Sequence, residues 1–318
     1  MDVHTIREQR ARIAASSGEW TAHNIQLAPG LFTLGDHPVG DDAKIRRIVQ
    51  VVSDLGGRPF PHLRVLDLAC LEGLYSVEMA LQGAAVVGIE GREASLAKAR
   101  LAKEALGLAR LDLQQGDVRR VTLETHGLFD VVLCLGILYH IEDPALFEWV
   151  MNLGRMTGRL LVIDTHIALE PRDTVSFAGR AYHGRRVVEH PAGSSPEEVR
   201  ARLWASLDNP DSFYLTEASL LRLLIHAGFT SVYHCLAPTE PDKVNDRVTL
   251  AALKGPPPLV LTSPHPGHLP RDSFPESAAR ATRDLGERLR GLLRASGLGA
   301  ARRWFQRARS APGRTSRR

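Results

Sequence analysis

Three short segments place polar side chains directly after apolar runs, and together they suggest a nucleoside site. Glu90 closes the run at 85–89, about 20 residues after a strand-to-helix loop, where a carboxylate can accept hydrogen bonds from both hydroxyls of a ribose. Asp117 follows a third run, where its carboxylate and the backbone N–H of Val118 match the polar edge of adenine. The alternatives are a solvated turn glutamate for the first residue and an ordinary helix N-cap for the second.

The loop at 65–73, VLDLACLEG, indicates what is attached to the nucleoside. Small residues let backbone approach a ligand closely, and the N–H groups that open the following helix can meet an anion. A dinucleotide site needs G-x-G-x-x-G, which this loop lacks. Glu72 would repel a pyrophosphate but attract an ammonium, which favours the methionyl tail of S-adenosylmethionine over NAD. The predicted contacts of this loop are Asp67, Ala69, Cys70, Glu72 and Gly73.

From residue 63 onward, short apolar runs alternate with longer amphipathic runs. Strand followed by helix, repeated, predicts a mostly parallel sheet covered on both faces. The linker between the last two strands has no room for a crossover helix, so we expect them to pair antiparallel. The predicted strands are 63–68, 85–89, 110–114, 129–135, 159–164, 231–235 and 247–253, and the predicted helices are 41–55, 74–81, 93–106, 144–156 and 216–227.

Four segments in this order resemble the class I S-adenosylmethionine-dependent methyltransferases: VLDLACLEGLYS (65–76), VVGIEGRE (86–93), QQGDV (114–118) and FDVVLCLGILYHIEDP (129–144). The resemblance implies an α/β fold, a Rossmann-like doubly wound sheet of seven strands with a reversed last strand, and S-adenosyl-L-methionine as cofactor. The family's loop is usually D-x-G-x-G-x-G, but here Ala69 and Leu71 replace the first two glycines. The implied cofactor set also includes Glu90, Gly91, Asp117, Val118 and Cys134.

GILYHIEDP and the lead-in WTAHNIQLAPGLFTLG (20–35) further resemble the branch that includes tRNA wobble-uridine carboxymethyl-forming enzymes and uncharacterised tailoring methyltransferases. We therefore expect an enzyme that methylates an oxygen on a small-molecule, glycan or lipid-linked acceptor. Two alternatives stay open. One is a tRNA-modifying methyltransferase, and the other is a non-catalytic nucleoside-binding or membrane-interaction protein.

His140 follows the fourth strand, beside the expected position of the methyl group, where an imidazole can act as base for a hydroxyl acceptor or be a structural histidine. His166, just past the fifth strand, is the second catalytic candidate. With Asp164 it forms only a two-residue pair, so we expect no metal. The insert 166–215 mixes aromatic, charged and amide groups, which suits a polyhydroxylated acceptor or a loop packed on itself. The predicted acceptor contacts are Tyr139, Tyr182, Glu189, His190, Asn209 and Phe213.

The formal net charge of +4 is unevenly distributed along the chain. Residues 276–318 hold 12 Arg and 3 acidic residues, a charge of +9, so residues 1–275 carry −5. We expect a basic helical or disordered tail that rests on an anionic membrane surface, binds RNA phosphates or is simply solvated. Seven prolines between 256 and 275 predict a linker. Before it, 1–60 is predicted as a lead-in and 61–255 as the methyltransferase domain.

The composition excludes several classes of protein. With 44% hydrophobic and 24% charged residues, the chain can bury a core and is not disordered as a whole. Three cysteines without a C-x-x-C pair exclude a disulfide scaffold. We find no secretory leader and no apolar run long enough to span a bilayer, so we expect a cytoplasmic enzyme. Its expected partner is a small-molecule or glycan-type acceptor, with nucleic acid as the alternative.

Overall fold

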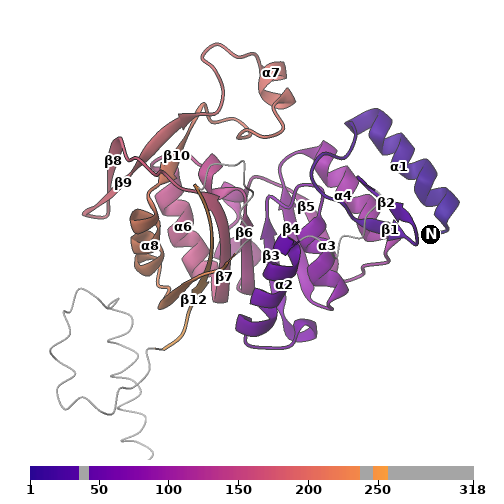
Figure 1. Cartoon of the computed structure of the whole chain (residues 1–318), viewed down its shortest axis with the longest axis horizontal. Coiled ribbons are helices and arrows are strands. Elements are labelled where there is room, and N and C mark those ends of the chain that lie inside the picture. Colours follow the sequence, from indigo (N-terminus) through magenta and orange to yellow (C-terminus); the bar gives the residue numbers. More distant parts are fainter. Residues whose placement is uncertain (36–42, 237–245, 257–318) are drawn as a thin grey trace, which may run out of the picture. The chain divides into compact units, whose positions relative to one another are not determined.

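The computed structural model describes residues 1–35, 43–236 and 246–256, and its main compact unit is built around a seven-stranded sheet (Figure 1). The strand order is β11-β12-β7-β6-β3-β4-β5. β12 runs antiparallel to both of its neighbours, and the other neighbouring pairs are parallel. The predicted sheet with a reversed last strand is therefore confirmed. Its strands are β3 (Arg64–Leu68), β4 (Ala85–Glu90), β5 (Leu111–Gln115), β6 (Phe129–Leu135), β7 (Thr157–His166), β11 (Ser231–His234) and β12 (Arg247–Leu253).

Two hydrophobic cores cover the two faces of this sheet. On β6, Val131 packs into one core and Val132 into the other, because successive side chains of a strand point to opposite faces. A strand buried on both faces has no polar alternation, which is why the central strands read as continuous apolar runs. The first core is covered by α1 (Val3–Ser17), α2 (Ala43–Leu55), α3 (Leu74–Leu81) and α4 (Glu93–Ala105), and the second by α5 (Leu123–His126), α6 (Ala145–Met156) and α8 (Glu217–His226).

Most predicted elements end within two residues of the observed ones. The predicted helix 74–81 and the predicted strands 129–135 and 247–253 coincide with α3, β6 and β12. In the lead-in, the structure adds a short hairpin of β1 (Gln26–Ala28) and β2 (Leu31–Phe32) that the sequence did not predict.

The insert after β7 is not a loop, as its sequence suggested, but a small antiparallel sheet of order β10-β9-β8 (Figure 1). A helix interrupts the connection between its last two strands. The elements are β8 (Asp173–Phe177), β9 (Arg180–Val188), α7 (Pro196–Ala201) and β10 (Asp211–Leu215). Phe213 N–H donates to the carbonyl of Ile141, which ties β10 to the loop after β6. The insert therefore lies beside the carboxyl end of the central parallel strands.

The predicted basic tail lies outside the described residues, as does all but the first residue of the predicted proline-rich linker. Within the described ranges, no helix has the length and apolar character needed to cross a bilayer.

Candidate active site

The loop after β3 takes up a conformation that glycine normally provides. Ala69 and Leu71 have φ values of 54° and 51°, and Gly73 follows with 90°. Each non-glycine residue in this region costs about 1–2 kcal/mol, so the surrounding structure must hold the loop in place. Cys70 N–H donates to the Ile89 carbonyl over 3.0 Å, which fastens the loop to β4. Ala69 and Leu71 thus have positive φ at the two positions where the family pattern has glycine.

Glu90 is a buried carboxylate at the end of β4. Its Oε2 accepts from Leu71 N–H at 2.9 Å and its Oε1 from Arg92 N–H at 2.7 Å. Burial raises the pKa of Glu90 above its ordinary value, although these hydrogen bonds lower it. Because a carboxylate offers about four acceptor sites, each oxygen keeps room for one more donor. The predicted role of Glu90, to receive two neighbouring hydroxyl groups, stays a prediction.

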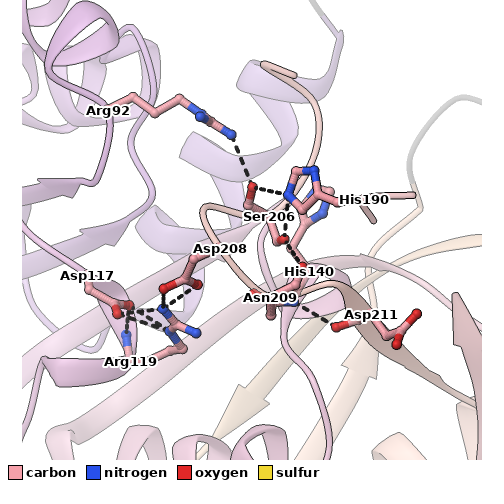
Figure 2. A network of polar contacts seen from close by, with 9 residues as sticks. All are labelled: Arg92, Asp117, Arg119, His140, His190, Ser206, Asp208, Asn209 and Asp211. Atoms are coloured by element: carbon pink, nitrogen blue, oxygen red, sulfur yellow. Dashed lines mark hydrogen bonds and ion pairs between the residues drawn. The ribbon is translucent and has the colours of Figure 1, made fainter. Parts of the chain in front are cut away.

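A pocket of about 510 Å³ begins at Gly91, next to Glu90, and reaches the turn after β5. Asp117 caps this turn by accepting from Arg119 N–H at 2.9 Å, and it also accepts from the Arg119 guanidinium at 3.0 Å (Figure 2). The pKa of Asp117 is lowered although burial opposes this, because the Arg119 hydrogen bonds outweigh burial. The predicted adenine contact thus shares its carboxylate with an arginine, and Val118 contributes a buried side chain to the second core.

A second pocket, of about 650 Å³, lies between the carboxyl end of β6 and the insert. His140 lines it, and its Nδ1 lies 2.9 and 3.0 Å from the two carboxylate oxygens of Glu189. The Ser206 N–H donates to Glu189 Oε2 at 2.9 Å. Burial raises the pKa of Glu189, but the hydrogen bonds and electrostatic attraction from His140, together with the Ser206 N–H, outweigh burial, so the pKa is lowered overall. A carboxylate on Nδ1 fixes the proton there, so the lone pair of His140 lies on Nε2.

His166 lines the same pocket but is bound differently. Its Nδ1 lies 2.9 Å from Asp246 Oδ1, and its Nε2 lies 3.3 Å from a guanidinium nitrogen of Arg247. Because arginine only donates, the lone pair of His166 on Nε2 is engaged. Tyr139 lies between the two imidazoles, with ring centroids 4.2 Å from His140 and 4.7 Å from His166. Of the two predicted bases, the structure therefore favours His140.

Comparison with known proteins agrees with this geometry. A family model described as a methyltransferase domain matches residues 59–197. Ubiquinone biosynthesis O-methyltransferase of Azotobacter vinelandii is 46% identical over 82 residues, which cover 26% of this chain and 35% of that protein. The corresponding protein of Maricaulis maris is 36% identical over 112 residues, which cover 35% of this chain and 43% of that protein. The chain thus spans between a third and a half of the length of these curated relatives.

A solved structure, the N-terminal domain of EvdMO1 in the presence of SAH and D-fucose, has the same fold, with a TM-score of 0.60 and 24% identity. The likeness covers 80% of this chain and 98% of that one. Residues 59–197 are therefore similar to a methyltransferase domain, as the sequence predicted. The comparisons do not specifically support the wobble-uridine branch of such domains.

Several loop residues of the methyltransferase domain are structural rather than exposed to a ligand. Glu72 is 1% exposed and accepts from the backbone N–H groups of residues 21–23, while Lys98 lies 3.1 Å away. Its predicted attraction of an ammonium is therefore wrong, because its oxygens already hold the lead-in. Asp67 is buried beneath the loop, where Ser76 Oγ donates to it. The thiols of Cys70 and Cys134 are in the cores, so only their backbone can face a cofactor.

Four predicted acceptor contacts are buried away from the second pocket, and these predictions are wrong. Tyr182 and Phe213 belong to the second core, because β9 and β10 turn these side chains inward. His190 lies 3.1 Å from the Ser206 carbonyl through Nε2, and Asn209 donates to the His140 carbonyl. Among the predicted acceptor contacts, only Tyr139 and Glu189 line the pocket.

The sequence missed the aromatic and basic residues that complete the site. Trp204 and Tyr214 line the acceptor side, and Arg92 and Arg119 reach across to the insert. No metal cluster of three or more His, Cys, Asp or Glu side chains occurs among the described residues. Asp164, considered earlier as a weak metal ligand, instead accepts from Lys44, Arg247 and Thr249.

Proposed function

We propose that this protein is an S-adenosylmethionine-dependent methyltransferase that methylates a hydroxyl oxygen of a small molecule, with His140 as the base. The observation that carries the proposal is the His140–Glu189 pair, which lines a pocket next to the predicted nucleoside site. This arrangement provides what an oxygen acceptor needs, which is a positioned group that removes its proton.

The cofactor fits the residues at the end of β4. The buried Glu90 carboxylate keeps two acceptor positions for a vicinal diol, and Gly91 opens the adjoining pocket. Asp117, with the Val118 N–H, would face the adenine edge. The loop at 69–73 would hold the tail through its backbone. When bound, S-adenosylmethionine supplies an electrophilic methyl group.

The acceptor pocket suits a molecule that joins a hydroxyl to an apolar or ring-shaped part. Three exposed apolar side chains belong to its lining, namely Val188 at 67%, Leu203 at 42% and Trp204 at 65% exposure. Deeper residues are polar: burial raises the pKa of Tyr214 to about 12, so its hydroxyl stays protonated and can donate a hydrogen bond. We further propose that the acceptor is a small molecule, a glycan or a lipid-linked molecule. We also propose that the protein is cytoplasmic and that residues 276–318 contact a membrane.

His140 would take the hydroxyl proton on Nε2 while Glu189 stabilises the imidazolium through Nδ1–H. Glu189 is suited to this, since its lowered pKa keeps it ionised. Positioning adds to the effect, because a hydroxyl held in line with the methyl group reacts as if it were highly concentrated.

Calorimetry and a transfer screen test the proposal. Wild-type protein should bind S-adenosylmethionine and its demethylated product, and Glu90→Ala should lose at least about tenfold in affinity, since hydrogen bonds to a charged group contribute about 1.5–3 kcal/mol. His140→Ala should bind both normally but transfer labelled methyl groups to hydroxylated small molecules about 10²–10⁴-fold more slowly. The exposed Glu170→Ala serves as control. Unchanged affinity in Glu90→Ala, or wild-type turnover in His140→Ala, would overturn it.

A further inference from the structure

We propose that residues 202–209, here called the partition, form one wall that the pocket beside Gly91 and the acceptor pocket share, and that Arg92 is the positioning residue that fixes this wall and thereby orients His140. The proposal rests on the proposed function for its kinetic part only. It assigns to the insert a role in assembling the base.

The partition contributes to both pockets. Leu207 and Asp208 line the pocket of about 510 Å³ beside Gly91. On the other side, the pocket of about 650 Å³ is lined by partition residues Arg202, Leu203, Trp204 and Ala205. One short segment is therefore in contact with both sites.

Arg92 joins the partition to the predicted ribose site. Its backbone N–H donates to Glu90 Oε1, and its guanidinium Nη2 donates to the carbonyls of Arg202 and Ala205, each at 2.9 Å. The same Nη2 donates to the Ser206 carbonyl at 3.3 Å, as Figure 2 shows. Carbonyl oxygens gathered around one guanidinium fix the backbone course of the segment, because arginine presents its donors in a rigid planar fork.

The position of the partition determines the orientation of the base, His140, through hydrogen bonds. The Ser206 N–H donates to Glu189 Oε2, and Glu189 holds His140 Nδ1. A second contact also ties the partition to this residue, since Asn209 Nδ2 donates to the His140 carbonyl at 3.0 Å. The orientation of His140 thus depends on where the partition lies.

Two more contacts hold the partition against the cofactor side. Asp208 pairs with Arg119 at 2.7 and 2.9 Å, and the same guanidinium holds Asp117 (Figure 2). Leu207 packs on Gly91 so closely that a Cβ there would lie 2.4 Å from Leu207 Cδ1. The absence of a side chain at this position is what lets the partition approach.

Arg92→Ala provides the test, because it keeps the backbone N–H on Glu90 and removes only the bonds to the partition. In the wild type, NMR of the histidine ring nitrogens, assigned with His140→Gln, should show His140 protonated on Nδ1. In Arg92→Ala this signal should give way to a tautomer mixture. Affinity for the demethylated cofactor should change by less than about threefold, while kcat falls about 10–100-fold.

Further variants separate the explanations. Arg92→Lys keeps the charge but not the fork and should give intermediate values, and Arg100→Ala, on the exposed side of α4, should match the wild type. A wild-type His140 tautomer in Arg92→Ala would overturn the proposal, as would a kcat that stays within about twofold of the wild type. A wild type without methyl transfer would refute only the proposed function, and the tautomer measurement would still decide the role of Arg92.

Discussion

Replacing Glu189 by glutamine exchanges one carboxylate oxygen for an NH₂ group, so two hydrogen-bond donors compete for the remaining oxygen. Glu189 accepts both from Ser206 N–H and from His140 Nδ1–H. An amide has only one oxygen. In Glu189→Gln an oxygen kept at the Oε2 position for Ser206 N–H leaves the NH₂ group at the Oε1 position, 2.9 Å from His140 Nδ1. Ser206 is buried at 4% exposure and its N–H has to keep an acceptor. The amide NH₂ will therefore face His140, and the imidazole will move its proton to Nε2.

This tautomer has no lone pair toward the acceptor pocket. Returning the proton to Nδ1 leaves a buried donor unsatisfied, which costs about 1–3 kcal/mol, or a factor of about 5–150 in the population of competent base. We therefore expect kcat in Glu189→Gln to fall about 10²-fold, below the ceiling of about 10⁴ for the loss of a general base. Affinity for the demethylated cofactor should not change, because Glu189 does not line that pocket.

The assay is transfer of a labelled methyl group at saturating cofactor and acceptor, with calorimetry for binding. Glu170→Gln, an exposed glutamate before β8, is the matched control and should behave as the wild type. A kcat of Glu189→Gln within about threefold of the control would refute the role of Glu189 as the group that orients the base.

Two further predictions concern stability. Gly73→Ala should destabilise the protein by about 2–4 kcal/mol in urea unfolding, because its φ is +90° and a Cβ would lie 2.8 Å from the Ala99 Cβ. Gly107 has a φ of +64° and open space around it, so Gly107→Ala should cost only about 1–2 kcal/mol. Equal losses in the two variants would contradict the effect of packing at Gly73. Burial raises the pKa of Asp67 from 3.8 to about 7, so the folded state binds its proton more tightly and stability falls as pH rises through this window, by at most about 4 kcal/mol. In Asp67→Asn the loss of stability that comes from Asp67 should be absent. If the free energies of unfolding of wild type and variant change in parallel between pH 5 and 8, Asp67 makes no such contribution.

The central sheet was predictable because strands buried on both faces consist of continuous apolar runs. All but two residues of β6 are buried, and its continuous apolar run matches the predicted strand. The strands of the insert contain no such apolar runs. β9 contains three arginines and is largely exposed, and Gly184 leaves room there for the Phe213 ring. Without an apolar period, its sequence could not be distinguished from a loop.

In the site, position along the chain placed Glu90 and His140 at the same edge of the sheet, because β4 ends at Glu90 and β6 ends shortly before His140. The environment of other residues could not be predicted. Tyr182 looked like an acceptor contact only because its neighbours are polar, but the pleat of β9 turns it into the core. The bonds from Arg92 to the insert join residues more than 100 positions apart, which no local pattern encodes.

The tie between Glu72 and the N-terminal lead-in bears on how this protein can be divided. Residues 59–197, the segment that similarity alone delimits, contain the Glu72 carboxylate but none of the three backbone N–H groups at 21–23 that donate hydrogen bonds to it. That segment also lacks β12, whose edge completes β7. An expressed fragment with these boundaries would expose a sheet edge and leave Glu72 paired with Lys98 but without its three backbone donors, so the segment that similarity delimits is smaller than the segment that completes the fold.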